Sequence, residues 1–407
     1  PDRGRGRDQL MHLHSRPTRG WWVTEEGVAR PDLGLMAVVV ALSGFGLLMI
    51  FSATRTALER QELLPSASTE RQLVFMLIGV VGMFALSYID YRNYQFLAPV
   101  LYLGCMVALG AAFLFDPVKG VQRWITIGPV NIQPAEFTKL ALVISLASLL
   151  SRGPEESYQQ LPWRKVGYAL AMLAPPVALI FLQPDLGTMM SLPFILLLML
   201  FVAGATRTQM TILALAAVGV VTTIWRFDLL AGHQIDRLRV FIDPDLDPQG
   251  LGWSIRQARL AMSSGQVTGQ GLFQGAITNQ GLVPEQESDF IFTAVGEQLG
   301  FVGGSVVLLG FGYVLWRLLR IAVTASDQYG SLLSMGVAAF LMFHVFVSVG
   351  MTLGLVPITG LPLPFLSRGG SFYLTSTAGV GIAVSVWRLR SRVRFGGVAG
   401  DRSLLAR

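Results

Sequence analysis

The stretch 186–204, LGTMMSLPFILLLMLFVAG, runs for 19 positions without a charged side chain. A bilayer core about 30 Å thick is crossed by a helix of roughly 20 predominantly apolar residues. Hydrocarbon offers no water to the backbone, so a run of this length must satisfy its own hydrogen bonds as a helix. The apolar residues are continuous rather than alternating, which excludes the pattern of a β-barrel strand. The stretch therefore predicts a membrane-spanning helix.

The same pattern recurs along the whole chain. Hydrophobic residues make up 52% of the 407 residues and charged residues 14%, whereas a soluble domain carries about 25% charged residues. About ten segments qualify as spans, with a break expected near Gly300 in the eighth. They lie near 33–51, 72–89, 96–115, 136–151, 166–183, 186–204, 209–226, 290–319, 331–355 and 370–387. The predicted fold class is an all-α polytopic membrane protein.

The net charge of +6 follows membrane topology rather than a nucleic-acid-binding pattern. Basic residues gather before the first span, after the last, and in alternate loops: Arg3, Arg5, Arg7, Arg16, Arg19, Arg152, Arg164, Lys165, Arg207, Arg317, Arg320, Arg388, Arg390, Arg392 and Arg394. With ten spans these segments share one side, which the positive-inside rule makes cytoplasmic. We expect both termini inside, no nucleic-acid partner, and Arg-rich tails that bind anionic membrane lipid.

This topology divides the chain into a basic arm (1–31), a membrane domain (32–390) and a tail (391–407). The connection 227–289, between spans seven and eight, is much longer than the others and is expected outside. Connections of this length are functional or disordered, and the apolar, helix-forming residues of this one favour order. Within it, Ser254–Met262 is predicted to form an amphipathic helix lying on the membrane.

Two further connections are expected on the outer side. One joins spans three and four (119–134). The other, 354–370, contains proline and glycine among leucines. An apolar loop of this kind cannot satisfy its backbone within lipid, so it should fold back into the protein and line a cavity. We expect the three outward loops to meet.

Asp289 is the most informative polar residue. It ends the polar stretch VPEQESD (283–289), and an apolar run follows at once. Acids in membrane proteins lie at boundaries or in cavities and are usually functional. In an extended segment Glu285, Glu287 and Asp289 would share a face, whereas in a helix only Glu285 and Asp289 would stack. Either arrangement raises carboxylate pKa values and favours a general base. The alternative is a solvated loop that ends at a helix N-cap.

Other charged residues near the outer ends of spans are candidates for binding. Glu136 and Lys139 are three apart and are expected to pair, either as structure or as part of a polar cleft. Asp185 suits a helix N-cap, with a substrate or metal role as the alternative. Arg123, beside Trp124, suits an interfacial anchor or a contact with an anionic headgroup.

Two features favour structural interpretations. The segment Asp243–Pro248 (DPDLDP) resembles a calcium loop, but Pro248 stands where such a loop needs glycine. Asx-capped turns are the better interpretation. His344, within span nine, is expected to be a buried, hydrogen-bonded residue rather than a ligand. The four histidines lack metal-site spacing.

Five strings resemble the SEDS family (shape, elongation, division and sporulation) in order over about 32–390. They are RWITIGPVNIQPAEFTK (123–139), QPDLGT (183–188), DPDLDPQGLGW (243–253), PEQESDFIFTAVGEQLG (284–300) and GLVPITGLPLPFLSRGGS (354–371). The pattern GMTLGLVPITGLPLPF is closer to the elongation members, RodA, than to the division members, FtsW. Departures stand at Glu287-Ser288, where His-Thr is common, and at Gln298, Ser348 and Arg368, where Glu, Asn and Tyr are common.

The resemblance implies a peptidoglycan glycosyltransferase in the bacterial cytoplasmic membrane that polymerises lipid II on the outer face. Asp289 would be the general base, and Arg123, Glu136, Lys139, Asp185, Arg237 and Arg256 would bind substrate. A divalent cation such as Mg²⁺ or Mn²⁺ held with Asp185 or Glu136 is an alternative source of positive charge. The implied partners are a class B penicillin-binding protein and the elongation machinery. The rival functions are a lipid II flippase and a non-catalytic scaffold for that penicillin-binding protein.

Overall fold

The computed structural model describes residues 30–390 apart from 61–63, 65, 119, 129, 153–159 and 228–231. The expected tail (391–407) and nearly all of the expected basic arm lie outside the described residues. Helices account for most of the described chain, and the one sheet among these residues is a hairpin of β1 (Ile125–Ile127) and β2 (Val130–Ile132). The all-α prediction is therefore confirmed apart from this hairpin.

Each of the ten expected spans is a long helix within the described residues. They are α1 (Leu33–Arg60), α2 (Ala67–Tyr88), α3 (Asn93–Ala111, continued by η1, Ala112–Leu114), α4 (Pro134–Leu150), α5 (Trp163–Leu182), α6 (Leu186–Ala203), α7 (Arg207–Arg226), α11 (Ile291–Thr324), α12 (Gln328–Thr352) and α13 (Gly370–Leu389). Seven described helices are long and apolar enough to cross a membrane, namely α1, α2, α3 with η1, α5, α6, α11 and α12. Since α4, α7 and α13 are not among these seven, the count of ten spans stays a prediction.

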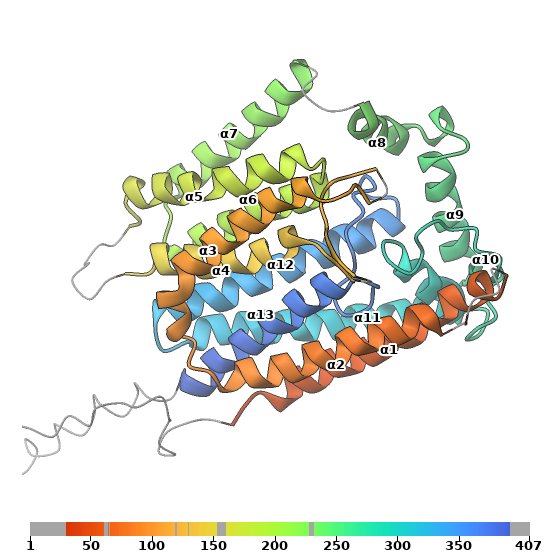
Figure 1. Ribbon diagram of the computed structural model, residues 1–407, viewed down its shortest axis with the longest axis horizontal. Helices are drawn as coiled ribbons and strands as arrows, with labels where there is room; N and C mark the ends of the chain where they lie inside the picture. Colours follow the sequence, from red (N-terminus) through yellow and green to blue (C-terminus); the bar gives the residue numbers. More distant parts are fainter. Residues whose placement is uncertain are drawn as a thin grey trace, which may run out of the picture.

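The long helices pack side by side, and α12 lies at the centre of the bundle (Figure 1). It contacts α4, α6, α11 and α13, while α2 packs along α13 and α3 along α4. Of the apolar stretch of α12, 83% is buried inside the protein, whereas α2 and α3 bury only 22% and 17% of theirs. A helix that is apolar all round and buried belongs to the interior of a bundle, so α12 forms the core on which the other spans assemble.

The long connection between α7 and α11 is ordered into α8 (Gly232–Ile242), η2 (Pro244–Leu246), α9 (Leu251–Ser264) and α10 (Ala276–Gln280). These elements gather at one end of the bundle (Figure 1). Two turns there are capped by Asx side chains, as expected: Asp243 accepts from the backbone N–H of Asp245, and Asp247 from that of Gly250.

The amphipathic helix expected at 254–262 is present as α9. Ile255, Ala258 and Ala261 are buried in a small core with Phe290, and α9 packs against α11. These apolar residues therefore find partners within the protein, where burial removes them from solvent. Leu260 stays 53% exposed, and contact of α9 with the membrane stays a prediction.

The break expected in span eight occurs at Gly300, whose φ of 63° and ψ of −160° interrupt α11. The glycine-rich segment after α9 satisfies the backbone groups that the break exposes. Gln270 and Gly271 donate to the carbonyls of Glu297 and Gln298 at 3.0 Å each, and Phe301 donates to Gln266 at 2.9 Å. Buried backbone groups must be paired, so this segment holds the first part of α11 in its orientation.

The loop 354–370 folds back into the protein, as expected. Leu361, Leu363 and Leu366 are almost fully buried, and Leu366 and Ser367 both donate a backbone hydrogen bond to Leu363. This loop lines one cavity together with the β1–β2 hairpin and the segment 285–289, and the three segments meet at the start of α13. The expectation that the three outward loops meet is confirmed.

Candidate active site

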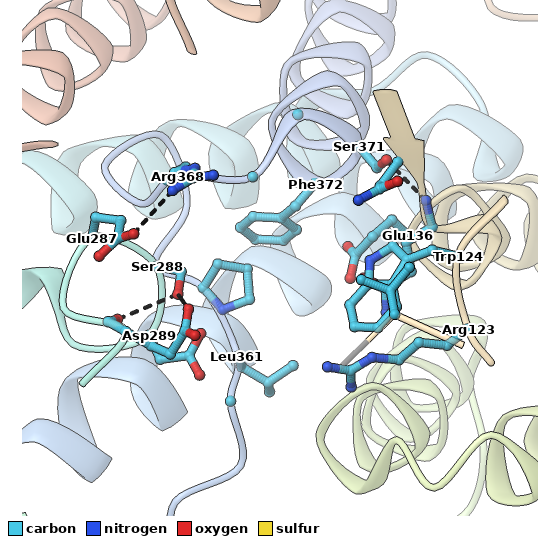
Figure 2. Close-up of a pocket in the computed structure, with 18 of the residues that line it drawn as sticks. Arg123, Trp124, Glu136, Glu287, Ser288, Asp289, Leu361, Arg368, Ser371 and Phe372 are labelled. Carbon is cyan, nitrogen blue, oxygen red and sulfur yellow. Dashed lines mark hydrogen bonds and ion pairs between the residues drawn. The ribbon is translucent and has the colours of Figure 1, made fainter. Parts of the chain in front are cut away.

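A cavity of about 500 Å³ opens where these loops meet. Its walls are the first turns of α2, the hairpin segment, the starts of α4, α6 and α13, the helix α8, and the loops 285–289 and 359–369. Five of the seven predicted site residues line it: Arg123, Glu136, Asp185, Arg237 and Asp289. Asp289 and Arg123 extend toward the cavity from opposite walls (Figure 2).

Asp289 is held by a tight turn rather than by a strand or a regular helix. Its backbone N–H donates to the carbonyl of Glu285 at 3.0 Å, as does that of Ser288 at 3.2 Å. Glu285 itself adopts a positive φ of 51°, which is uncommon for a residue with a side chain. The turn therefore brings Glu285 and Asp289 together, as in the helical alternative. Gly360, with φ of 74°, passes so close that an added Cβ would lie 3.2 Å from Asp289 Oδ2.

Burial raises the pKa of Asp289 to about 6, and the nearby Glu285 carboxylate acts in the same direction. Ser288, Arg123 and Arg237 act in the opposite direction. Desolvation and a like charge both disfavour the ionised form. Glu287 is not among the causes of this shift, which agrees with the helical alternative, in which only Glu285 lies beside Asp289.

Two guanidinium groups face this carboxylate. Arg123 stacks over the ring of Trp124 at 4.2 Å and lies 3.6 Å from Asp185, and its side chain stays 30% exposed. Its Nε is buried and has no hydrogen-bond partner within the described part of the chain. Arg237 donates to the carbonyl of Thr359 at 3.2 Å, and burial lowers its pKa while Asp289 opposes that effect. Because the Arg123 side chain lines the cavity and stays partly exposed, its guanidinium can donate to an anion there.

Asp185 caps α6, as expected. Its Oδ1 accepts from the backbone N–H of Thr188 at 3.1 Å, and its Oδ2 accepts from Gln133 Nε2 at 2.9 Å. Gln133 also donates its backbone N–H to Ser371 Oγ at 3.0 Å. The aspartate thus joins the hairpin to α6 and orients Arg123. Gln133 and Ser371 were not predicted as site residues, although both lie inside the quoted motifs.

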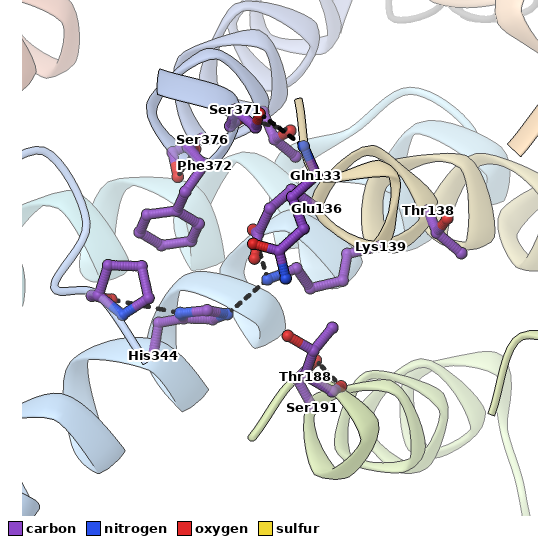
Figure 3. Close-up of polar contacts among 12 residues, drawn as sticks. Gln133, Glu136, Thr138, Lys139, Thr188, Ser191, His344, Ser371, Phe372 and Ser376 are labelled. Atoms are coloured by element: carbon purple, nitrogen blue, oxygen red, sulfur yellow. Dashed lines mark hydrogen bonds and ion pairs between the residues drawn. The ribbon is translucent and has the colours of Figure 1, made fainter. Parts of the chain in front are cut away.

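Glu136 and Lys139 pair at 2.7 Å, but only Glu136 lines the cavity. Lys139 is fully buried behind it and contacts His344 Nε2 at 2.8 Å. His344 reaches the carbonyl of Pro362 through Nδ1 at 3.3 Å and stacks on Phe372, as Figure 3 shows. A neutral imidazole that donates from Nδ1 and accepts at Nε2 satisfies both contacts. His344 is thus the buried, hydrogen-bonded residue that was expected.

Arg256 does not belong to the cavity. Its guanidinium pairs with Asp245 at 2.5 Å and donates to the Pro248 carbonyl at 3.0 Å. The sequence placed it with the other cations because α9 belongs to the long connection, but the face of the helix that carries it points to η2. It supports that turn rather than the cavity.

Within the described ranges no group of three or more Asp, Glu, His or Cys side chains is arranged to hold an ion. Glu136 is paired with Lys139, and Asp185 is engaged by Gln133 and Arg123. Mg²⁺ is usually bound by one or two carboxylates together with the phosphates of a substrate, so a cation held with Asp185 or Glu136 beside a bound pyrophosphate stays a prediction.

A further ion pair lines the opposite wall. Arg368 Nη1 lies 2.9 Å from Glu287 Oε1, and the dashed line in Figure 2 joins them. The pair was not predicted, because 81 residues separate its members and no local pattern relates them.

Comparison with known proteins agrees with this geometry. The family model described as cell cycle protein, for FtsW, RodA and SpoVE, matches residues 33–392. The chain belongs to this family. Its helices and its cavity-lining loops all fall within the matched region.

Relatives from several branches match at similar identity. Stage V sporulation protein E of Bacillus subtilis is 34% identical over 88% of this chain and 97% of its own length. The probable peptidoglycan glycosyltransferase FtsW of Trichlorobacter lovleyi is 32% identical, over 88% and 93%. The peptidoglycan glycosyltransferase MrdB of Escherichia coli is 31% identical, over 87% and 93%. These matches together with the apolar helices make the chain an integral membrane protein.

Solved structures share the fold. A chain of a peptidoglycan synthase complex that coordinates polymerisation and crosslinking superposes with a TM-score of 0.73 at 28% identity, over 89% of this chain and 99% of that chain. The rod shape determining protein RodA of Thermus thermophilus superposes with a TM-score of 0.63 at 27% identity, over 88% and 97%.

Proposed function

We propose that the cavity polymerises lipid II into glycan strands, with Asp289 as the general base. The chain is a peptidoglycan glycosyltransferase, since the family that it belongs to includes relatives of that name matched over most of their length. The proposal concerns the roles of the cavity residues in the transfer of the sugar. The observation that carries the proposal is a carboxylate with a pKa of about 6, facing two arginines across an open cavity.

The reaction needs one proton acceptor. The hydroxyl of the acceptor sugar gives its proton to the Asp289 carboxylate while its oxygen forms a bond with the anomeric carbon of the donor. The bond from that carbon to the pyrophosphate oxygen breaks, and the polyprenyl pyrophosphate leaves with the electron pair. A general base of suitable pKa is worth about 10²–10⁴-fold in rate. A single displacement inverts the anomeric centre, by the logic established for glycoside hydrolysis.

The leaving group needs positive charge rather than a proton. Arg123 and Arg237 face Asp289 and line the cavity, and the Arg123 side chain stays 30% exposed. Guanidinium groups bind phosphate oxygens in a planar fork and stay charged. We therefore assign them to the pyrophosphate, with Asp185 orienting Arg123 and Glu136 closing the adjoining wall.

Two rival functions have different requirements. A flippase needs alternating access with a site near the bilayer midplane, whereas the charged residues of this cavity lie in loops and at helix starts, among the elements at one end of the bundle. A scaffold for a class B penicillin-binding protein would not need a tuned carboxylate at all. The cavity chemistry therefore favours the polymerase, with such a protein as partner.

We further infer that the cavity faces outward from the bacterial cytoplasmic membrane and that the enzyme acts in elongation. The first inference rests on the basic residues of the connections at the opposite end. The second rests on the resemblance of the 350–365 pattern to RodA. Matches to sporulation, FtsW and MrdB proteins at 31 to 34% identity leave a division role equally open.

The test is Asp289→Asn, which keeps the size of the side chain but removes its basicity. We expect a loss of about 10²–10⁴-fold in the rate of glycan formation from labelled lipid II, with near-normal expression and near-normal binding of the penicillin-binding protein. Asp116→Asn makes the same chemical change at an exposed position outside the cavity and should polymerise normally. If the Asp289→Asn variant keeps more than about a tenth of the parental rate, Asp289 is not the base.

A further inference from the structure

The Glu287–Arg368 pair joins two loops that carry different parts of the cavity. Besides the ion pair at 2.9 Å, the backbone N–H of Arg368 donates to the Glu287 carbonyl at 2.8 Å. Both side chains line the cavity. One loop ends in Asp289 two residues later, and the other leads into α13.

Arg368 is the fixed member of the pair. The next residue, Gly369, donates to Gln72 Oε1 of α2 at 3.2 Å. Gly370 packs so closely on the ring of Phe75 that an added Cβ would lie 2.6 Å from it. The chain at 368–370 is therefore bound to α2 on one side and continues into a helix on the other. The turn 285–289 has its own internal hydrogen bonds, and Arg368 attaches that turn to this fixed point.

The pair is poorly placed to stabilise the fold. The Arg368 side chain is 38% exposed and that of Glu287 is 23% exposed, and ion pairs of such exposure contribute little to stability. Its position next to the turn is a more specific property. An unpaired Glu287 would place a further carboxylate on the wall that already carries Glu285 and Asp289, where it would compete for the cations that the substrate needs.

We propose that Glu287 and Arg368 are positioning residues of this active site, which fix the turn 285–289 so that Asp289 faces the arginines across the cavity. This inference rests on the proposed function.

The test is a double-mutant cycle on the full-length protein in lipid nanodiscs, with labelled lipid II as substrate. Glu287→Gln and Arg368→Gln should each lower kcat by about 10-fold, because small displacements of a catalytic group are costly, with KM and the thermal unfolding midpoint near parental values. The double Gln variant should be no slower than either single variant. The exchange Glu287→Arg with Arg368→Glu should recover most of the lost kcat.

A matched control is Arg92→Gln, which breaks the guanidinium–carboxylate pair with Asp327, of similar exposure and outside the cavity. It should leave kcat unchanged. Additive losses in the double variant, or no recovery in the exchanged variant, would overturn the proposal. So would a fall in unfolding midpoint that accounts for the fall in kcat, since the pair would then be structural. If Asp289→Asn stays active, the proposed base fails whatever the cycle shows. If it is inactive and the cycle is additive, only the pair fails.

Discussion

Asp289 is placed where ionisation is costly, and that cost makes it useful as a base. A carboxylate with an ordinary pKa near 3.8 holds a proton weakly, whereas burial raises the pKa of Asp289 to about 6. The same desolvation strengthens its attraction to Arg123 and Arg237. These arginines offset part of the cost and leave the residue able to ionise near neutral pH.

This environment predicts the pH dependence of the reaction. The base acts as a carboxylate, so kcat/KM should rise about tenfold per pH unit below 6 and level off above it. The effect of Asp289 on folding has the opposite sign to this rise in rate. Because the pKa is raised in the folded state, that state binds more protons than the unfolded chain between about 4 and 6, so the contribution of Asp289 to stability falls as pH rises. Initial rates from pH 5 to 8 test this, and a flat profile would contradict the assignment.

Individual residues of the site show what the sequence could predict and what it could not. The break from polar to apolar residues located Asp289, and the spacing of three located the Glu136–Lys139 pair. Local spacing could not show that Lys139 lies behind the cavity, because its burial depends on His344 and Phe372 from distant segments. Nor could it show that Arg256 faces η2. No local spacing indicated the Glu287–Arg368 pair, and the sequence marked its two positions only as departures from the family resemblance.

At the scale of elements, the broken helix α11 controls where Asp289 lies. Its first part begins just after the residue, and the segment 266–271 binds the backbone exposed at Gly300. The break itself was predictable from a glycine in an overlong apolar run. The segment that satisfies it was predictable only as a cluster of glycines, because its partners are about 30 residues away.

Gly269→Ala tests this junction. Gly269 has φ of 82°, and an added Cβ would lie 2.2 Å from the Gln298 carbonyl. We expect a loss of about 1–3 kcal/mol in stability, seen as a lower thermal unfolding midpoint, together with reduced polymerisation because the start of α11 shifts. Gly312→Ala, within α11 itself, is the control, since its added Cβ meets nothing within 4 Å. If the two variants behaved alike, the junction would not hold α11.

At the scale of the whole molecule, the basic connections expected inside lie at the end of the bundle opposite to the long connection 227–289. Segments expected on the cytoplasmic side contact one another: Leu161 donates to the Gly204 carbonyl at 3.1 Å, and Arg152 donates to Gln328 Oε1 at 2.9 Å. The helices α8, α9 and α10 gather at the other end (Figure 1), where α8 forms part of the cavity wall. A polyprenyl tail gains about 0.8 kcal/mol for each CH₂ that stays in lipid. For the proposed lipid-linked substrate we therefore expect the cavity to open sideways to the bilayer.

This arrangement predicts the topology of the chain. Reporter fusions after Gly265, in the long connection, and after Arg394, in the tail, should lie on opposite sides of the membrane, because an odd number of spans separates them. An enzyme active only outside should work at Gly265, and a protein fluorescent only inside should work at Arg394. A fusion after Gly204, in a connection expected inside, should behave like the one at Arg394. Fusions at Gly265 and Arg394 that report the same side would contradict this topology and, with it, the outward placement of the cavity.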